Sequence, residues 1–169
     1  KVKNMWSYIR ENFVLKFIPR WRFMNTYAQA GEDAIAHYFF ITHGIDSPTY
    51  LDIGTNKPIY GNNTFLFYKR GNKGVCIEAD PVLYKDIVLV RKRDVCINAA
   101  VTFDDKTVAN FYIFDERAYN TLSKEEAESR QDNANVKIKE IISVPLININ
   151  QVIETYFNGT APDFITIDV

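Results

Sequence analysis

The stretch Thr49-Tyr50-Leu51-Asp52-Ile53-Gly54-Thr55-Asn56 decides the fold of this chain. It is a short apolar run that leads into an acidic residue and a glycine. A buried parallel strand has this pattern, and Asp52 then lies at the carboxyl tip of the strand, where a wound α/β sheet opens to ligands. Gly54 makes the turn that follows. The stretch therefore predicts the first strand of a nucleotide-cofactor site.

A second stretch repeats this form roughly 25 positions later. Val75-Cys76-Ile77-Glu78-Ala79-Asp80-Pro81 is again an apolar strand that ends in a carboxylate. Its distance from the first strand is the spacing expected for the group that holds the ribose hydroxyls of a cofactor. The two stretches together are far more informative than either one alone.

Four strands with intervening helices predict one parallel sheet. The strands are expected at residues 50–53, 74–78, 95–101 and 164–169, and the helices at residues 31–42, 63–70, 81–90 and 150–157. The right-handed crossover rule winds such an alternation into a Rossmann-like α/β sheet. We expect the spatial order third, second, first, fourth, because the switch point must lie beside the first strand.

Residues 107–146 interrupt this alternation and predict an insertion. Residues 107–113 and 137–146 have the pattern of the two strands of a hairpin, and Ser123-Lys124-Glu125-Glu126 is a capping box that opens a polar helix. Residues 115–135 are highly polar. They form either a mobile lid or a solvated loop, and we favour mobility.

Residues 1–22 are predicted to form an amphipathic helical segment that precedes a single domain at residues 23–169. Apolar residues recur there at helical spacing, at Met5, Trp6, Ile9, Phe13 and Phe17, and the pattern ends at Pro19. We interpret the segment as a helix that packs on the domain or on a partner subunit, with a membrane surface as the alternative. A homodimer through this helix or through an exposed sheet edge is a further hypothesis.

Composition and charge indicate a folded protein with no strong electrostatic partner. The chain has 169 residues, 47% of them hydrophobic, and a net charge of −1, so it offers no broad basic field to nucleic acid. The triplet Arg91-Lys92-Arg93 lies where a helix dipole favours basic residues. Cys76 and Cys96 lie in strand-like runs and are expected to be free thiols. No run approaches the roughly 20 apolar residues of a membrane span, and no cluster has metal-ligand spacing. We expect a soluble, cytoplasmic protein.

The residues after the first strand argue against a dinucleotide cofactor. The run Gly54-Thr55-Asn56-Lys57-Pro58-Ile59 lacks two of the three glycines that let a pyrophosphate approach a helix. S-adenosylmethionine carries no phosphate and needs only one open turn with hydrogen-bonding groups. We therefore predict a cofactor without phosphates, such as S-adenosylmethionine.

The strand tips supply the groups that this cofactor requires. Asp52 is placed to attract its ammonium group, and Glu78 to accept both ribose hydroxyls. Asn98 is placed to bond the adenine amine, with small residues after it that leave room for the ring. Asp168 would face the transferred methyl group and the acceptor. Each carboxylate alone is more often a cap, but four agreeing strand tips strengthen the assignment.

Several motifs resemble the FkbM-type S-adenosylmethionine-dependent methyltransferases, and the resemblance covers residues 27–169. The motifs are Gln29-x-Gly31-Glu32-Asp33, the run from Leu51 to Pro58, Asn63-Thr64, the run from Tyr68 to Gly71, the run from Gly74 to Pro81, and the run from Ile165 to Val169. The resemblance implies methyl transfer, usually to a hydroxyl oxygen of a sugar or secondary metabolite. It also implies a fold truncated after the fourth core strand, because members of the family generally continue past it.

These arguments define three sets of candidate residues. The catalytic candidates are Asp168 and Glu32. The cofactor-binding candidates are Asp52, Gly54, Thr55, Asn56, Glu78, Ala79, Asp80, Asn98, Ala99 and Ala100. The substrate-binding candidates lie in loops and are Gln29, Tyr60, Asn62 and Asn63. Two alternatives stay open: a module that binds S-adenosylmethionine or another nucleoside without turnover, and a protein that docks a partner.

Overall fold

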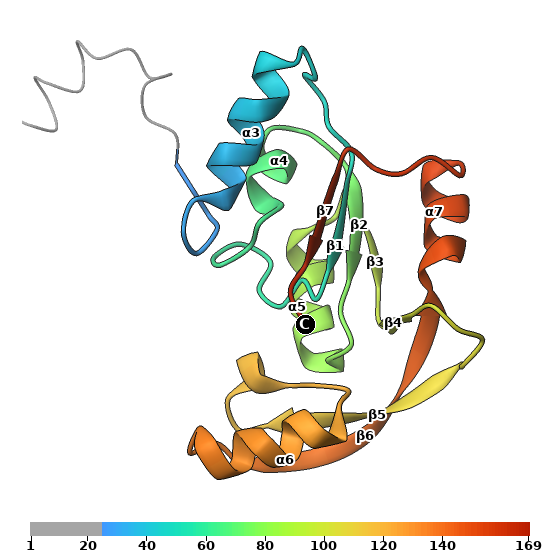
Figure 1. The fold of residues 1–169 in the computed structure, drawn as a ribbon. Coiled ribbons are helices and arrows are strands. Elements are labelled where there is room, and N and C mark those ends of the chain that lie inside the picture. The colour runs from blue at the N-terminus through green and yellow to red at the C-terminus, as the bar shows by residue number, and fades with distance from the viewer. Residues whose placement is uncertain (1–24) are drawn as a thin grey trace, which may run out of the picture.

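The computed structural model describes residues 25–169, and a four-stranded parallel sheet lies at the centre of this part of the chain (Figure 1). Its strands are β1 (Tyr50–Ile53), β2 (Gly74–Ile77), β3 (Val95–Ile97) and β7 (Phe164–Ile167). Their order is β3-β2-β1-β7, and every neighbouring pair is parallel. The predicted order of the core sheet is therefore confirmed. The amphipathic helix predicted over residues 1–22 lies outside the described residues.

Helices cover both faces of this sheet. They are α3 (Glu32–Thr42), α4 (Phe65–Lys69), α5 (Pro81–Val90) and α7 (Ile149–Phe157). Successive residues of β1 point to opposite faces, so Leu51 packs with Val152 of α7 while Tyr50 packs with Phe67 of α4. Figure 1 shows α7 on one side of the sheet, and α3 and α4 on the other. Burial on both faces explains why β1 reads as an almost continuous apolar run.

Local sequence signals fix the start and the end of these helices. Asp80 caps α5, because its carboxylate accepts hydrogen bonds from the backbone N–H groups of Val82 and Leu83, and Pro81 occupies the first helical position. Asn148 caps α7 in the same way, and that helix ends at Asn158 in the left-handed conformation. These boundaries agree closely with the predicted ones.

The third predicted strand differs from the structure. The expected strand over residues 95–101 is divided into β3 in the core sheet and β4 (Ala100–Thr102), which joins a second sheet. The division falls at Asn98, whose side-chain amide donates hydrogen bonds to the backbone carbonyls of Glu78 and Ala79. Asn98 thereby fastens the end of β3 to the tip of β2, and the chain leaves the core sheet directly afterwards.

The insertion forms a small sheet of its own. Its strands are β4, β5 (Val108–Phe114) and β6 (Ile138–Asn148), in the order β4-β6-β5. The antiparallel pairing of β5 with β6 confirms the predicted hairpin. Residues between these strands form the short 3-10 helix η3 (Arg117–Tyr119) and the helix α6 (Lys124–Asn133), which Ser123 caps as expected. Ala127 of α6 is fully buried against Tyr112 and Phe114 of β5, so the polar segment is anchored; its mobility stays a prediction.

The two cysteines lie on neighbouring strands of the core sheet. Cys76 and Cys96 are free thiols, as expected, and they are register partners on β2 and β3. Within residues 25–169, no helix combines the length and the apolar composition that crossing a membrane requires.

Candidate functional site

A cavity of about 840 Å³ lies between the carboxyl ends of the core strands and the insertion. The core contributes Gly54 and Asn56 after β1, Glu78 after β2, and Asp168 after β7. The insertion contributes residues from η3 through α6. The carboxyl edge of a wound sheet is where such folds bind ligands, and the cavity lies at that edge.

Glu78 is the most constrained acidic group of the cavity. Its side-chain oxygen Oε2 accepts a hydrogen bond of 2.7 Å from the backbone N–H of Asn56, and Oε1 accepts one of 2.8 Å from that of Asp80. The residue is only 6% exposed. Burial raises the pKa of Glu78 above its ordinary value, although the two backbone hydrogen bonds act in the opposite direction. A carboxylate oxygen can accept more than one hydrogen bond, so each oxygen of Glu78 can still accept a hydrogen bond from a hydroxyl group of a ligand.

The turn after β1 brings three strand tips together. Gly54 has φ +76°, and a Cβ atom there would lie 2.1 Å from the backbone oxygen of Asp168. Only glycine permits this close approach. Asn56 has φ +55°, a conformation that asparagine tolerates better than most residues, and its N–H is the one that holds Glu78. The turn thus fixes Glu78 and the end of β7 relative to β1.

Asp52 lies beneath this turn and does not line the cavity. It is 3% exposed, and its Oδ2 accepts hydrogen bonds from Asn62 Nδ2 at 3.0 Å and Thr64 Oγ1 at 2.7 Å. Burial raises the pKa of Asp52 above its ordinary value, against the lowering effect of the Thr64 hydrogen bond and of Arg91. The structure therefore places Asp52 as an anchor for residues 62–64 and not at the cavity surface, where we had expected it to meet an ammonium group.

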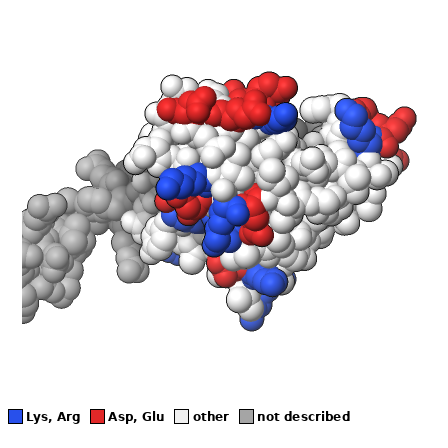
Figure 2. Space-filling model, turned by 90° about the horizontal axis from the view of Figure 1, so that it is seen from below, with Lys and Arg blue, Asp and Glu red and all other residues white. Residues whose placement is uncertain are grey.

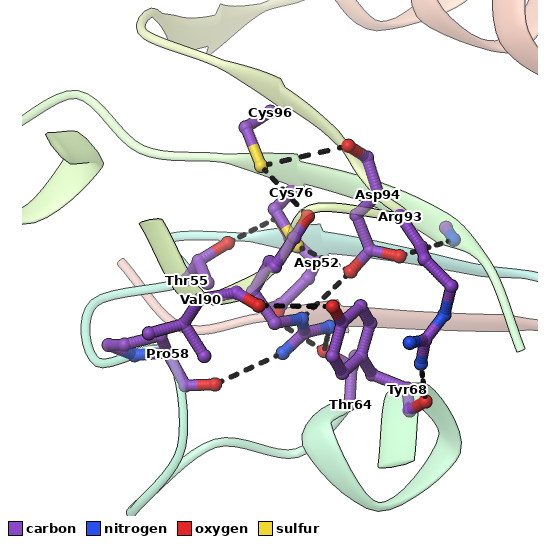
Figure 3. A network of polar contacts seen from close by, with 12 residues as sticks. Asp52, Thr55, Pro58, Thr64, Tyr68, Cys76, Val90, Arg93, Asp94 and Cys96 are labelled. Carbon is purple, nitrogen blue, oxygen red and sulfur yellow. Dashed lines mark hydrogen bonds and ion pairs between the residues drawn. The ribbon is translucent and has the colours of Figure 1, made fainter. Parts of the chain in front are cut away.

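Arg91 donates hydrogen bonds to several residues around Asp52. Figure 3 shows this polar network, with Asp52, Thr64, Tyr68 and Asp94 labelled. The residue is fully buried, and its Nε donates to Asp94 at 2.8 Å. Nη1 donates to Asn62 Oδ1 at 3.1 Å, and Nη2 to Thr64 Oγ1 at 2.8 Å. The guanidinium also lies 4.8 Å from the ring centroid of Tyr68, a favourable cation–π arrangement. Arg91 lies at the carboxyl end of α5, as expected, but we did not predict its burial or its partners; only Asp94, three residues later, indicated the pairing.

Asp80 joins the core to the insertion. Its Oδ1 caps α5, and its Oδ2 accepts a hydrogen bond from Asn120 Nδ2 at 2.9 Å and forms an ion pair with Arg117. Asp80 is fully buried, whereas Arg117 and Asn120 line the cavity. We did not predict Arg117 and Asn120 from the sequence, because the pattern of a polar segment does not show which of its side chains face a cavity.

Several predicted residues lie together around the cavity. Among the cofactor candidates, Gly54, Asn56, Glu78, Ala79, Ala99 and Ala100 line it, and so do Gln29 and Asp168. Thr55 and Asp80 are buried behind the lining, and Asn98 uses its amide to tie β3 to β2.

The other substrate and catalytic candidates lie away from the cavity lining. Asn62 is buried in the Arg91 network, and Asn63 donates from Nδ2 to Thr166 Oγ1 at 3.0 Å. Tyr60 is 74% exposed. Glu32 is exposed in the first turn of α3, where its Oε2 accepts from the backbone N–H of Ala30. Of the two catalytic candidates, only Asp168 faces the cavity.

A parallel sheet in this order, with helices on both faces and a cavity at the carboxyl ends of its strands, is a Rossmann-like α/β fold. The family description "Methyltransferase FkbM domain" matches residues 52–169, which is most of the chain. The chain therefore belongs to the FkbM methyltransferase domain family. The match begins at Asp52, so the resemblance that we noted for residues 27–51 lies outside it. Comparisons with curated proteins and with solved structures returned no match.

Replacement of Gly54 by alanine tests the close packing of the turn. We expect Gly54→Ala to lower the free energy of unfolding by clearly more than Gly44→Ala. Gly44 has a similar φ of +71°, but a Cβ there would meet nothing within 4 Å, so it reports only the backbone cost of about 1 kcal/mol. Urea unfolding of both variants measures the difference. Equal losses would contradict the close approach of the turn to Asp168.

Removal of the Arg91 guanidinium tests the network. Arg91→Met leaves the buried Asp94 carboxylate without its partner, so we expect a loss of about 3–5 kcal/mol of unfolding free energy. Lys92→Met removes a neighbouring exposed charge and should change it by about 0.5 kcal/mol or less. Thermal and urea unfolding of the two variants give the comparison. A small effect at Arg91 would show that the network does not hold the fold.

Proposed function

We propose that this protein binds S-adenosylmethionine across the tips of β1 and β2 and transfers its methyl group to a hydroxyl oxygen of a small molecule. The observation that carries the proposal is the Glu78 carboxylate, which two backbone N–H groups hold at the edge of the cavity. Membership of the methyltransferase family supports the reaction type. Sugars and secondary metabolites are the acceptors that we expect.

The lining of the cavity suits a nucleoside without phosphates. Both arginines of the lining are already paired: Arg117 with Asp80, and Arg130 with Glu126 and the carbonyl of Tyr119. Figure 2 likewise shows Lys and Arg in small groups beside Asp and Glu on the face seen from below. A pyrophosphate would need unpaired cations or a glycine-rich turn, and this edge of the sheet has one glycine.

Each part of the cofactor has residues that fit it. The ribose hydroxyls would bond to Glu78, and the adenine ring would lie beside Ala99 and Ala100, which line the cavity. The open turn at Gly54 and Asn56 would take the amino-acid end. When bound, this cofactor supplies an activated methyl group on a sulfonium.

The protein's own part in the reaction is to align the acceptor and to help remove its proton. Asp168 lines the cavity at the end of β7, and Gln29 lines the same region from the loop before α3. We assign Asp168 to orient the acceptor hydroxyl and to accept its proton, with Gln29 as a hydrogen-bonding partner for the acceptor. Alignment of the two reacting groups supplies most of the acceleration.

The pH dependence of cofactor affinity tests the role of Glu78. Only the ionised carboxylate can accept hydrogen bonds from both ribose hydroxyls. The affinity for S-adenosylhomocysteine should therefore be highest at pH values above the raised pKa of Glu78 and should fall as the pH drops through that pKa. At pH 8, Glu78→Gln should weaken binding about ten- to a hundredfold and remove the pH dependence. Calorimetric titration measures both effects.

Glu126→Gln provides the matched control for this experiment. Glu126 lines the same cavity from α6 but is exposed, and its side chain pairs with Arg130. Its replacement should leave the affinity for S-adenosylhomocysteine nearly unchanged. An unaltered affinity in Glu78→Gln would exclude the assigned role.

Substitution of Asp168 separates a base from a structural residue. If Asp168 accepts the proton, Asp168→Asn should lower methyl transfer by about a hundredfold or more while cofactor affinity is kept. Transfer from labelled S-adenosylmethionine into a small-molecule extract gives the rate, and Glu32→Gln is the parallel variant. Turnover within a few-fold of the unchanged protein would show that Asp168 is not the base. Cofactor binding with no transfer in the unchanged protein would favour a binding module.

A further inference from the structure

Helix α3 is apolar around most of its circumference, but the described fold covers one side of it only. Phe40 is 4% exposed, and its ring centroid lies 5.7 Å from that of Phe67 in α4. On the opposite side, Ile35, Tyr38 and Phe39 are 71%, 67% and 53% exposed. A helix that is hydrophobic all round is normally buried on all sides.

These exposed side chains form one continuous surface, which we call the α3 patch and define as Ile35, Tyr38, Phe39 and Ile41. The first three lie at positions i, i+3 and i+4, the spacing of neighbours on one helix face, and Ile41 extends the surface at its edge. No Asp, Glu, Lys or Arg occurs from residue 34 to residue 42. An apolar surface of this kind marks an interaction site.

The chain enters the described fold beside this helix. The Oγ1 atom of Thr26 donates to Asp33 Oδ1 at 2.5 Å, and the backbone N–H of Tyr27 donates to Asp33 Oδ2 at 2.7 Å. Asp33 belongs to the first turn of α3 and is fully buried. The preceding 24 residues are therefore joined to the fold at the amino-terminal end of α3.

The length of the preceding segment allows it to reach the patch. Helix α3 has 11 residues and is about 16 Å long. Seven extended residues span up to about 23 Å, so residues 18–24 can connect the end of α3 to a second helix beside it. A helix over residues 5–17 would be about 20 Å long, enough to cover the patch.

We propose that residues 5–17 pack as a helix on the α3 patch, antiparallel to α3. The apolar stripe of this segment, Met5, Trp6, Ile9, Phe13 and Phe17, would meet the patch, which carries no charge that burial would have to desolvate. Lys16 would lie on the same helix face as Ile9 and Phe13, so its ammonium group would reach water at the end of its alkyl stem. The tether holds the stripe near the patch at an effective concentration in the millimolar range, an advantage that a separate partner lacks. This contact is independent of the proposed methyl transfer.

The chain contains a natural reporter for this contact. Its two tryptophans are Trp6 and Trp21, so the Trp21→Phe variant leaves Trp6 as the only tryptophan. We expect Trp6 to emit at short wavelength and to resist quenching by acrylamide. Ile35→Asp with Phe39→Asp should shift the emission to longer wavelength and increase quenching. Leu89→Asp is the matched control, because Leu89 is 68% exposed on α5, and it should leave Trp6 unchanged.

A reciprocal reporter keeps the test valid if the α3 variant folds poorly. In a chain with Trp6→Phe and Trp21→Phe, Tyr38→Trp places the only tryptophan in the patch, and Phe13→Asp with Phe17→Asp should shift its emission to longer wavelength. Far-ultraviolet circular dichroism checks the fold of each variant.

Three results would overturn the proposal. One is an unchanged Trp6 emission in the folded Ile35→Asp, Phe39→Asp variant. A second is protection of Trp6 that disappears on dilution, which would identify a second copy as the occupant. The third is protection that arises only when vesicles of phosphatidylserine and phosphatidylcholine are added, which would identify a membrane surface.

Discussion

A buried guanidinium needs a partner for its N–H groups, because an unpaired charge inside a protein costs several kcal/mol. Arg91 meets this requirement with side chains from three parts of the chain: Asp94 at the start of β3, Asn62 and Thr64 in the loop before α4, and Tyr50 in β1. The loop that follows β1 is irregular, and few apolar contacts could hold it. The hydrogen bonds of Arg91 to Asn62 and Thr64 therefore hold the loop after β1 in position, which hydrophobic packing alone would not do.

The candidate site inherits its geometry from this network. Asn62 and Thr64, which Arg91 also contacts, both donate hydrogen bonds to Asp52. The end of the loop is therefore bound to β1, where the loop begins, beneath the floor of the cavity. Between these ends lies Asn56, whose backbone N–H orients the Glu78 carboxylate. The glycine at position 54 permits the same turn to touch the end of β7, next to Asp168. A polar core thus preorganises a carboxylate that a ligand can use without first ordering a loop.

The predictable parts of this protein are those that follow from local patterns. The apolar runs predicted the positions of β1, β2 and β7 in the sequence. The preference for right-handed crossover connections then predicted their order, because it allows few arrangements of the strands in a parallel sheet. The spacing between Asp52 and Glu78 predicted that Glu78 would lie at the ligand-binding edge of the sheet, and Glu78 does line the cavity. The burial of Arg91 was not predictable, since Asp94 is its one nearby partner and the other three, Asn62, Thr64 and Tyr50, lie 27 to 41 residues away in the sequence. The division of β3 from β4 and the link from Asp80 to Arg117 depend in the same way on distant side chains.

The local role of an acidic residue at a strand tip was equally hard to read. Asp52 and Glu78 were both expected at strand tips, yet Asp52 lies within β1, in register with Cys76, and is an internal anchor, whereas Glu78 follows the end of β2 and lines the cavity. The register of the two strands places Glu78 two residues further along than Asp52, and the side chains of Asn62 and Thr64 bond to the Asp52 carboxylate. Sequence spacing gives the position of a carboxylate along a strand but not which neighbours will cover it.

A crystal structure of the protein with S-adenosylhomocysteine tests the central claim most directly. The account predicts both ribose hydroxyls within hydrogen-bonding distance of Glu78, with Arg91, Asn62 and Thr64 still bonded as described and Asp52 still beneath the turn. A ligand bound elsewhere, or an Asp52 carboxylate that turns out of the network to contact it, would contradict the account.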